Sequence, residues 1–227
     1  MKTNLYDIAS GRAAFYQLLV AVFELLPGQL LLAKIRDGEF QRMLESYSRL
    51  GEEGFGAGLE LISQYRFHIR DRADEDVLTD LAVDRTRIMR GTGHTDMKPP
   101  YEGLYKKGRA FEHSVLGVKR FYRKAALLPD ETNKDSVDYL CVELDFMRQL
   151  CLREENLRLK NAAGETIASV LALEEEFLRV HLGSWISEFC SAVKKHASTD
   201  FFRGFALILN AYIRTEKKWL ESVVRRA

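Results

Sequence analysis

The chain has 227 residues, of which 46% are hydrophobic and 30% charged, enough to fill a sizeable core and to keep a soluble surface. Its 34 basic and 33 acidic side chains leave a formal net charge of +1. That balance argues against nucleic acid as a partner, because nucleic-acid-binding domains are strongly basic. Three scattered cysteines do not make a disulfide framework, so we expect a reduced, cytoplasmic protein.

Apolar residues at helical spacing predict a first helix over residues 6–26, ended by Pro27 and Gly28. Its expected buried stripe consists of Ile8, Phe15, Leu19, Val22 and Leu26. The apolar part is about 14 residues long and contains Glu24, so it is too short and too polar to span a membrane. We therefore expect a core helix and no stable membrane insertion. Shorter helices are predicted near residues 30–37 and 40–47.

Glycines then gather at positions 51, 54, 56 and 58. A phosphate-cradling loop would require Gly-Lys-Ser/Thr at its end or a strand before it, and the sequence has neither. The glycines are better explained by the start of a helix that packs tightly. Helical spacing continues from Leu59 to Ile69 and from Val77 to Ile88, separated by a charged run at 70–76 that we expect to be solvated.

The segment from residue 91 to 100 interrupts this regularity most strongly, since it contains Gly91, Gly93, Pro99 and Pro100. It predicts a division into an N-terminal helical part (about 1–90) and a C-terminal part (101–227), joined by a Gly/Pro-rich hinge loop. Because no stretch alternates as a strand would, we predict one all-α, multi-helix globular domain.

In the C-terminal part, helices are predicted over 110–127, from Val137 to about residue 160, over 166–195, and from 199 onward. The helix beginning at Val137 carries Leu140, Leu144 and Met147 on one face. The helix over 166–195 carries apolar residues, with His181 and Trp185 among them, at every fourth position.

No motif for metal binding or covalent catalysis is present. His181 has no second histidine three or four positions away and is best read as a hydrogen-bonded core residue. The run Glu174 to Glu176 points in several directions around a helix and predicts a solvated face. Cys141 and Cys151 are interpreted as small core side chains. We expect no catalytic residue, no metal and no cofactor.

Three segments together resemble the TorD/DmsD-like redox-enzyme maturation chaperones. The first is DRTRIMRG at 84–91 followed by PPYEGLY at 99–105, similar to the family's YxRLFxG helix end and PPYESxY loop. The second is DYLCVELDFM at 138–147, similar to DHxxxELxFM. The third is EFLRVHLGSW at 176–185, similar to FxxxHxxxW. Tyr139 stands where the family usually has His, and Gly103 where Ser is common.

The resemblance implies an all-helical TorD-like fold and a non-enzymatic cytoplasmic chaperone. Such chaperones bind the twin-arginine signal peptide, and often the apo body, of a molybdopterin-containing oxidoreductase, and hold it until its cofactor is inserted, before Tat export. The family also includes domain-swapped homodimers, for which Gly91, Gly93, Pro99 and Pro100 would form the hinge here.

A twin-arginine peptide requires carboxylates beside an apolar groove, since charge-assisted bonds orient arginine and apolar burial supplies affinity. We expect Asp138, Glu143 and Glu102 to be the carboxylates. We expect Tyr101, Tyr105 and Tyr139 to be the walls, with the first turn at 138–139 exposed to the peptide.

Structural alternatives remain for each of these residues. Asp138 could only cap its helix, Glu143 could pair with Arg85 or Arg87, and the tyrosines could only hold the loop. For the whole chain, the alternative is an all-helical adaptor or assembly subunit that binds a partner protein without reading a signal peptide. A helical hydrolase or nucleotide-binding protein is a third class, without any local motif in its favour.

Overall fold

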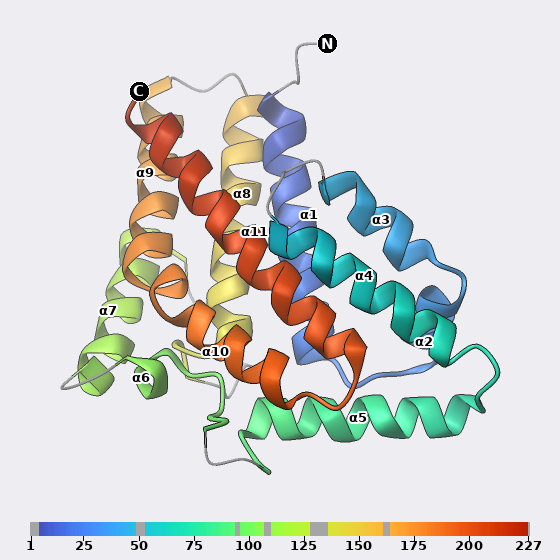
Figure 1. Ribbon diagram of the computed structural model, residues 1–227. Helices are drawn as coiled ribbons and strands as arrows, with labels where there is room; N and C mark the ends of the chain where they lie inside the picture. The colour runs from blue at the N-terminus through green and yellow to red at the C-terminus, as the bar shows by residue number, and fades with distance from the viewer. Residues whose placement is uncertain are drawn as a thin grey trace. The chain divides into compact units, whose positions relative to one another are not determined.

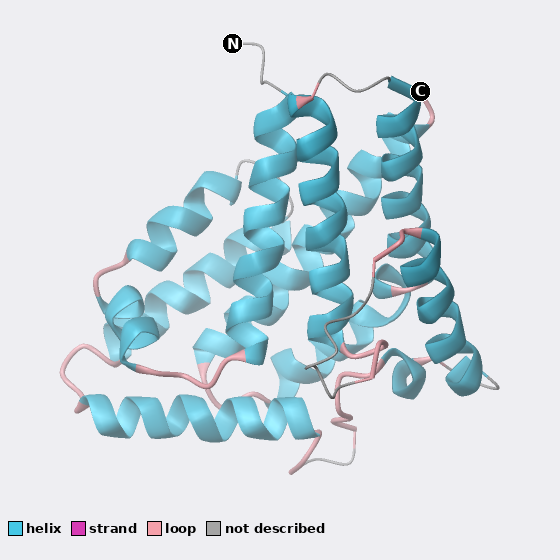
Figure 2. Cartoon of the chain, turned by 180° about the vertical axis from the view of Figure 1, so that it is seen from behind, coloured by secondary structure: helices cyan, strands magenta, loops and turns pink. Residues whose placement is uncertain are grey.

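Helices make up the regular secondary structure of the computed structural model, which describes residues 5–48, 53–93, 96–106, 110–127, 136–160 and 164–226 (Figures 1 and 2). Those ranges contain no strand, only one isolated antiparallel bridge between Tyr101 and Tyr139. The prediction of an all-α fold is confirmed. The helices are α1 Leu5–Glu24, α2 Gln29–Arg36, α3 Glu39–Ser48, α4 Glu53–His68, α5 Asp74–Arg90, α6 Glu102–Tyr105, α7 Ala110–Lys124, α8 Leu140–Leu159, α9 Gly164–Val180, α10 Leu182–His196 and α11 Asp200–Val224.

The first helix is shorter than its apolar pattern predicts. It ends at Glu24, and the next two leucines lie outside it, with Leu25 61% and Leu26 70% exposed. The expected place of Leu26 in the buried stripe is therefore wrong. The physical reason is Pro27, whose ring disfavours helical backbone angles at the residue before it.

The long helix expected over 166–195 is divided in two at His181, because α9 ends at Val180 and α10 begins at Leu182. The amide and the hydroxyl of Ser184 both donate to the His181 carbonyl, at 2.8 and 2.6 Å, and make a tight turn. Gly183, a poor helix former, follows the break directly. Lys106 Nζ donates to the carbonyl of Val180 at 2.6 Å and satisfies an acceptor that the ending helix leaves free.

The described chain packs as two compact units. The first unit comprises Met1–Glu24, Tyr101–Trp185 and Glu216–Ala227, and the second comprises Leu25–Pro100 and Ile186–Thr215. One boundary falls between Pro100 and Tyr101, where the predicted hinge loop ends. Other boundaries fall inside α10 and α11, so each of these helices contributes residues to both units.

The first unit is built on α1 and α8, which run side by side in both views (Figures 1 and 2). Its aromatic core joins α7, α8 and α9, with ring centroids 4.4 Å apart for Tyr122 and Phe146 and 4.5 Å apart for Phe146 and Phe177. The Tyr122 hydroxyl donates to the carbonyl of Val142 at 3.0 Å, so this buried polar group is satisfied.

The second unit contains a close approach of two helix backbones. A Cβ placed on Gly58 of α4 would lie 2.6 Å from the carbonyl oxygen of Gly204 in α11, and one on Gly204 would lie 2.7 Å from the oxygen of Gly58. Only glycine fits both positions. The tight packing predicted for this glycine-rich segment is thus found, and edge-to-face contacts of Phe40 with Phe201 and Phe205 lie in the same unit.

Within the second unit, Asp84 of α5 holds the start of α11. Its carboxylate accepts hydrogen bonds from the amides of Ser198 and Thr199 at 2.9 and 2.8 Å, and from both of their hydroxyls. The C-terminal end of α5 is capped by Gly91. Its φ of +61° is the left-handed conformation that a glycine C-cap adopts. Asp84 therefore has a structural role in capping.

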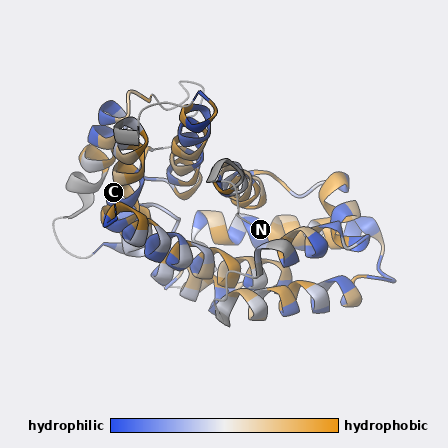
Figure 3. Cartoon of the chain, turned by 90° about the horizontal axis from the view of Figure 1, so that it is seen from above, coloured by the Kyte–Doolittle hydropathy of each residue, from blue (hydrophilic) through white to orange (hydrophobic). Residues whose placement is uncertain are grey.

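Hydrophobic and hydrophilic residues alternate along the helices, as expected when one side of each helix is buried (Figure 3). No single helix in the described ranges is long and apolar enough to cross a membrane; only α1 and α2 taken together, with the break between them, have that length and composition. The three cysteines are buried and form no disulfide, and burial raises the pKa of the Cys151 and Cys190 thiols, which therefore stay protonated.

Candidate functional site

The six residues predicted to bind a peptide come together in the first unit, where the segment preceding α8 meets α6. Tyr101 and Tyr139 form the isolated bridge, and their ring centroids are 5.1 Å apart. The amide of Glu102 donates to the carbonyl of Asp138 at 2.9 Å, and the amide of Gly103 donates to Asp138 Oδ2 at 3.3 Å. Two segments that are 35 residues apart in the sequence are joined by these bonds.

The expected exposure of residues 138–139 is wrong. Asp138 is only 2% and Tyr139 7% exposed. The helix begins three residues later than predicted, at Leu140, with Tyr139 as its N-cap and no side-chain capping bond. Asp138 consequently does not cap α8, and its carboxylate stabilises the α6 turn through Gly103 instead.

Glu102 is fully buried between two basic side chains. His181 Nδ1 lies 3.0 Å from both carboxylate oxygens, and Lys106 Nζ forms an ion pair with Oε1. Burial by itself would raise the pKa of Glu102, but the hydrogen bonds from His181 and Lys106 outweigh it and lower the pKa. Glu102 is therefore an ionised carboxylate in the interior.

Glu143 is also fully buried but has a different environment. Trp185 Nε1 donates to Oε2 at 3.1 Å, Oε1 accepts from no N–H donor among the described residues, and the carboxyl group shares a hydrogen bond with that of Glu102. Burial, followed by the negative charge of Glu102, raises the pKa of Glu143 well above its usual range, so Glu143 holds its proton more firmly than an exposed glutamate does. In the described residues its partners are thus Trp185 and Glu102, and neither Arg85 nor Arg87, the two arginines considered as alternatives.

Aromatic side chains surround the two carboxyl groups. Tyr105 is 4% exposed, and its ring centroid lies 5.3 Å from that of Trp185. The imidazole of His181 contacts Phe121 edge to face at 5.0 Å. It also lies so close to α7 that a Cβ on Gly117 would be 2.8 Å from its Cε1, so a glycine is needed there. Tyr101, by contrast, is partly exposed and lies at the edge of the cluster.

This arrangement suits recognition of a cation. It combines the buried carboxylate of Glu102, the carboxyl group of Glu143 with its raised pKa, and aromatic walls. Sequence reasoning placed His181 and Trp185 in the core, where they are, but did not foresee their bonds to Glu102 and Glu143. The only indication of a shared site in the sequence was that His181 and Trp185 lie four positions apart, on one face of the predicted helix. Lys106, which pairs with Glu102, carried no signal in the sequence.

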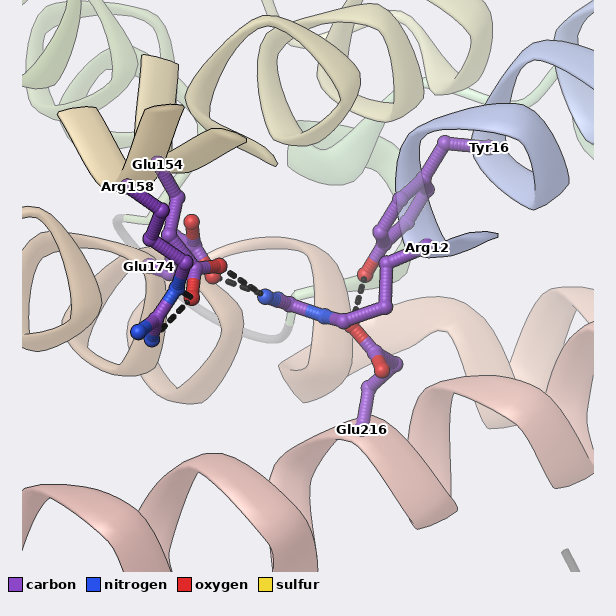
Figure 4. Close-up of polar contacts among 6 residues, drawn as sticks. All are labelled: Arg12, Tyr16, Glu154, Arg158, Glu174 and Glu216. Atoms are coloured by element: carbon purple, nitrogen blue, oxygen red, sulfur yellow. Dashed lines mark hydrogen bonds and ion pairs between the residues drawn. The ribbon is translucent and has the colours of Figure 1, made fainter. Parts of the chain in front are cut away.

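A second buried charged cluster surrounds Arg12 of α1 and was not predicted (Figure 4). Arg12 Nη1 lies 2.8 Å from Glu154 Oε2, Arg12 Nε lies 2.8 Å from Glu216 Oε2, and Nη2 pairs with Glu174. The guanidinium carbon is also 4.5 Å from the ring centroid of Trp219. One arginine thereby connects α8, α9 and α11 to α1.

The expectation that Glu174 lies on a solvated face is wrong, because its side chain is fully buried. Burial raises the pKa of Glu174 to about 7 even though Arg12 lowers it, since Arg12 is shared among three carboxylates. Its neighbour in the cluster, Glu154, has a second cation, because Arg158 Nε donates to Glu154 Oε1 at 2.7 Å. The position of the Arg12 cluster between four helices favours a structural role.

A search of the described ranges finds no group of three or more His, Cys, Asp or Glu side chains that could hold a metal ion. The polar chemistry of this part of the chain consists of the Glu102–Glu143 site and the Arg12 cluster, together with capping bonds and surface ion pairs.

Comparison with known proteins agrees with this architecture. The model of the nitrate reductase delta subunit family matches residues 49–191, more than half of the chain. A Chaperone protein TorD from Shewanella pealeana is 22% identical over 223 residues, covering 93% of this chain and 90% of that protein. A Chaperone protein TorD from Vibrio parahaemolyticus is 22% identical over 192 residues, covering 79% and 86%.

The family match includes α5, α6 and α8, which carry the loop and helix motifs at 84–105 and 138–147, and the TorD relatives are matched over most of their length. These relatives are named as chaperones and not as enzymes, in keeping with a buried site that has no catalytic motif. The chain therefore belongs to the nitrate reductase delta subunit family and is similar to proteins named as TorD chaperones.

Proposed function

We propose that this chain is a cytoplasmic chaperone that binds the twin-arginine signal peptide, the apo form, or both, of a molybdopterin-containing oxidoreductase. It would assist cofactor insertion and hold the client before Tat export. The observation that carries the proposal is the buried pair Glu102 and Glu143, in which Glu102 is charged and Oε1 of Glu143 accepts from no N–H donor in the described part of the chain. An unsatisfied buried acceptor is costly unless a ligand completes it.

The ligand would enter by replacing Lys106. In the free chain Lys106 supplies the cation beside Glu102, and its side chain is 24% exposed although Glu102 is fully buried. An arginine from the peptide would take over this charge and use its planar fork of donors to reach Glu143 Oε1 as well. The apolar part of the signal peptide would then lie against Tyr101 and the aromatic residues behind it.

The test is a titration of the chain with the client's leader peptide and with the same peptide carrying Lys-Lys in place of Arg-Arg. We expect the Arg-Arg peptide to bind at least about tenfold more tightly, since lysine lacks the planar fork of donors that would bridge Glu102 and Glu143. Glu102→Gln should reduce this preference, whereas Glu176→Gln, on the partly exposed face of α9, should leave it unchanged. Equal affinity for the two peptides would overturn the proposed site.

A further variant tests the replacement step. Lys106→Met removes the competing cation, so the Arg-Arg peptide should bind several-fold more tightly to it than to the natural chain. The matched control is Lys124→Met, which removes an exposed lysine paired with Glu176 in the same unit. Weaker peptide binding by Lys106→Met would mean that Lys106 supports the ligand and does not compete with it.

The second candidate function is an all-helical adaptor or assembly subunit that binds a partner protein without reading a signal peptide. It is favoured by the burial of Asp138, Glu102 and Glu143, since a peptide reaches them only if the α6 region opens. Binding of the apo oxidoreductase with and without its leader distinguishes the two functions, because an adaptor would bind both forms equally.

We also propose that the loop at 91–100 acts as the hinge of a domain-swapped homodimer. Gly91 and Gly93 have φ values of +61° and +95°, which other residues rarely adopt, so a local change of direction is built into the loop. Asp96 ties the loop to α10 through Lys195 and His196, each at 2.7 Å. Opening of the hinge would require both contacts to separate, of which the exposed Asp96–Lys195 ion pair is lost at small energetic cost.

A further inference from the structure

A cleft of about 470 Å³ lies within the second unit, well away in sequence from the proposed peptide site. It is lined by Arg36 of α2, by Ser63, Arg66 and Phe67 of α4, and by Arg70, which follows α4. Small-molecule sites commonly have volumes of roughly 300–1,000 Å³, so the cleft has room for a ligand. Three of its five lining residues are arginines, and none is acidic.

The positive charge of the cleft is only weakly compensated. Arg66 Nε donates to the carbonyl of Arg36 at 2.9 Å, and no carboxylate in the described part of the chain pairs with Arg66. Arg70 pairs with Asp71 at 3.0 Å, but both side chains are more than 60% exposed, and such pairs contribute little. Arg36 Nη2 pairs with the half-exposed Asp74 at 2.9 Å and donates to the carbonyl of Arg72 at 2.7 Å. A multiply charged anion can therefore compete for all three guanidinium groups.

Two lining residues retain unused binding capacity. The Nε atom of Arg36 is buried and has no acceptor among the described residues, although a buried N–H normally has one. Phe67 is 64% exposed, and the guanidinium carbon of Arg70 lies 4.8 Å from its ring centroid. A large exposed aromatic ring beside clustered arginines offers a stacking surface next to an anion site.

We infer that this cleft binds a small molecule that carries a phosphate group together with a planar ring. A phosphate group presents at least three oxygens and nearly two negative charges, so it can bond to more than one guanidinium at once, whereas a single carboxylate has two oxygens and one charge. Arg66 and Arg70 would hold the phosphate, the Ser63 hydroxyl would donate to it, and the ring would lie against Phe67.

The inference is tested by calorimetry on the full chain with four probes at one fixed ionic strength: inorganic phosphate, phenyl phosphate, citrate and phenol. Phenyl phosphate should bind saturably and at least about fivefold more tightly than inorganic phosphate, because its phosphate contacts the arginines while its ring contacts Phe67. Phenol, which has no anionic group at neutral pH, should not bind measurably. Higher salt should weaken the binding of both phosphates.

Variants locate the site. Arg66→Met and Arg70→Met should each weaken phenyl phosphate binding about tenfold, and Phe67→Ala should remove its advantage over inorganic phosphate. Arg70 is on the surface, so its variant stays interpretable even if Arg66→Met perturbs the contact with α2. The matched control is Arg90→Met, which removes an exposed arginine of the same unit that does not line the cleft.

Three results would overturn the inference. Absence of saturable phosphate binding at millimolar concentrations would exclude the site. Unchanged affinity in both arginine variants would place the phosphate elsewhere on the molecule. Citrate that binds more tightly than phenyl phosphate would assign the cleft to carboxylates. None of these results depends on whether the chain binds a signal peptide.

Discussion

Arg12 Nε, in the first helix, lies 2.8 Å from Glu216 Oε2, in the last helix, 204 positions later in the chain. The same guanidinium also bonds to Glu154 and Glu174, so one side chain neutralises part of three buried carboxylates. In the first unit, α1 is thereby joined to α8, α9 and the end of α11. The consequence is that the fold of this unit depends strongly on a single charge.

Replacing Arg12 with methionine is expected to lower the free energy of unfolding by about 3–5 kcal/mol, because three buried carboxylates lose their shared cation. Urea unfolding followed by circular dichroism measures the change. The matched control is Arg179→Met, which breaks the exposed pair with Glu175 on α9 and should cost less than about 1 kcal/mol. Equal effects of the two variants would contradict a structural role for the Arg12 cluster.

The raised pKa of Glu174 predicts how the free energy of unfolding changes with pH. Burial raises it from 4.5 to about 7 in the folded chain, so the folded state holds the proton more tightly than the unfolded state. The stabilisation that protonated Glu174 contributes to the folded state is fully present below about pH 4.5 and is lost as the pH rises through 7.

Glu174→Gln removes this titration and should flatten the pH profile of stability. Between pH 5 and pH 8, the free energy of unfolding of the variant relative to the natural chain should rise by about 2–3 kcal/mol. Urea unfolding at several pH values provides the measurement, with Glu176→Gln on the partly exposed face of α9 as a control that keeps the natural slope. Parallel profiles for Glu174→Gln and the natural chain would show that Glu174 titrates alike in both states.

The contact between Gly58 and Gly204 makes alanine at position 58 unfavourable. A Cβ there would lie 2.6 Å both from the Gly204 carbonyl oxygen and from Cγ1 of Ile208, so α4 and α11 must separate. We expect Gly58→Ala to destabilise the chain by about 2–3 kcal/mol in thermal or urea unfolding.

Gly56, on the same helix, provides the control, because a Cβ there would meet nothing within 4 Å. Gly56→Ala should therefore stabilise α4 by about 0.5–1 kcal/mol, since alanine is the better helix former. Opposite signs for the two substitutions are the expected result. A loss of stability at both positions would mean that the glycines serve backbone flexibility and not the close helix contact.

Asp96→Asn tests the attachment of the proposed hinge. Hydrogen bonds from Lys195 and then from His196 lower the pKa of Asp96, so the contact persists at neutral pH and weakens only in acid. Loss of the carboxylate should loosen the loop and raise the fraction of dimer seen by size-exclusion chromatography with light scattering. Asp80→Asn, on α5, is the control, because it breaks the exposed pair of Asp80 with Arg72. Equal dimer fractions for both variants would show that Asp96 does not hold the hinge loop in place.

Much of the fold could be predicted from the sequence, because helices are local structures. The apolar spacing located α5 and α8 to within a few residues, and the glycine pattern indicated the close packing that Gly58 makes. The motif residues at 101–105 and 138–143 were expected to act together, and the structure brings them into one cluster. Two helix boundaries differ from the prediction: Pro27 ends α1 earlier than its apolar pattern indicates, and a turn divides the predicted long helix into α9 and α10.

What the sequence determined by itself is the set of helices and the grouping of the motif residues, since backbone hydrogen bonds and side-chain periodicity act over a few positions. Tertiary structure alone decided which charged groups are buried and what they bond to. Asp138, Glu143 and Glu174 resemble surface residues in the sequence, and each is buried by helices that are distant in the chain. Burial and charge pairing are non-local, so neither the cluster at Arg12 nor the arginine cleft could be read before the helices were packed.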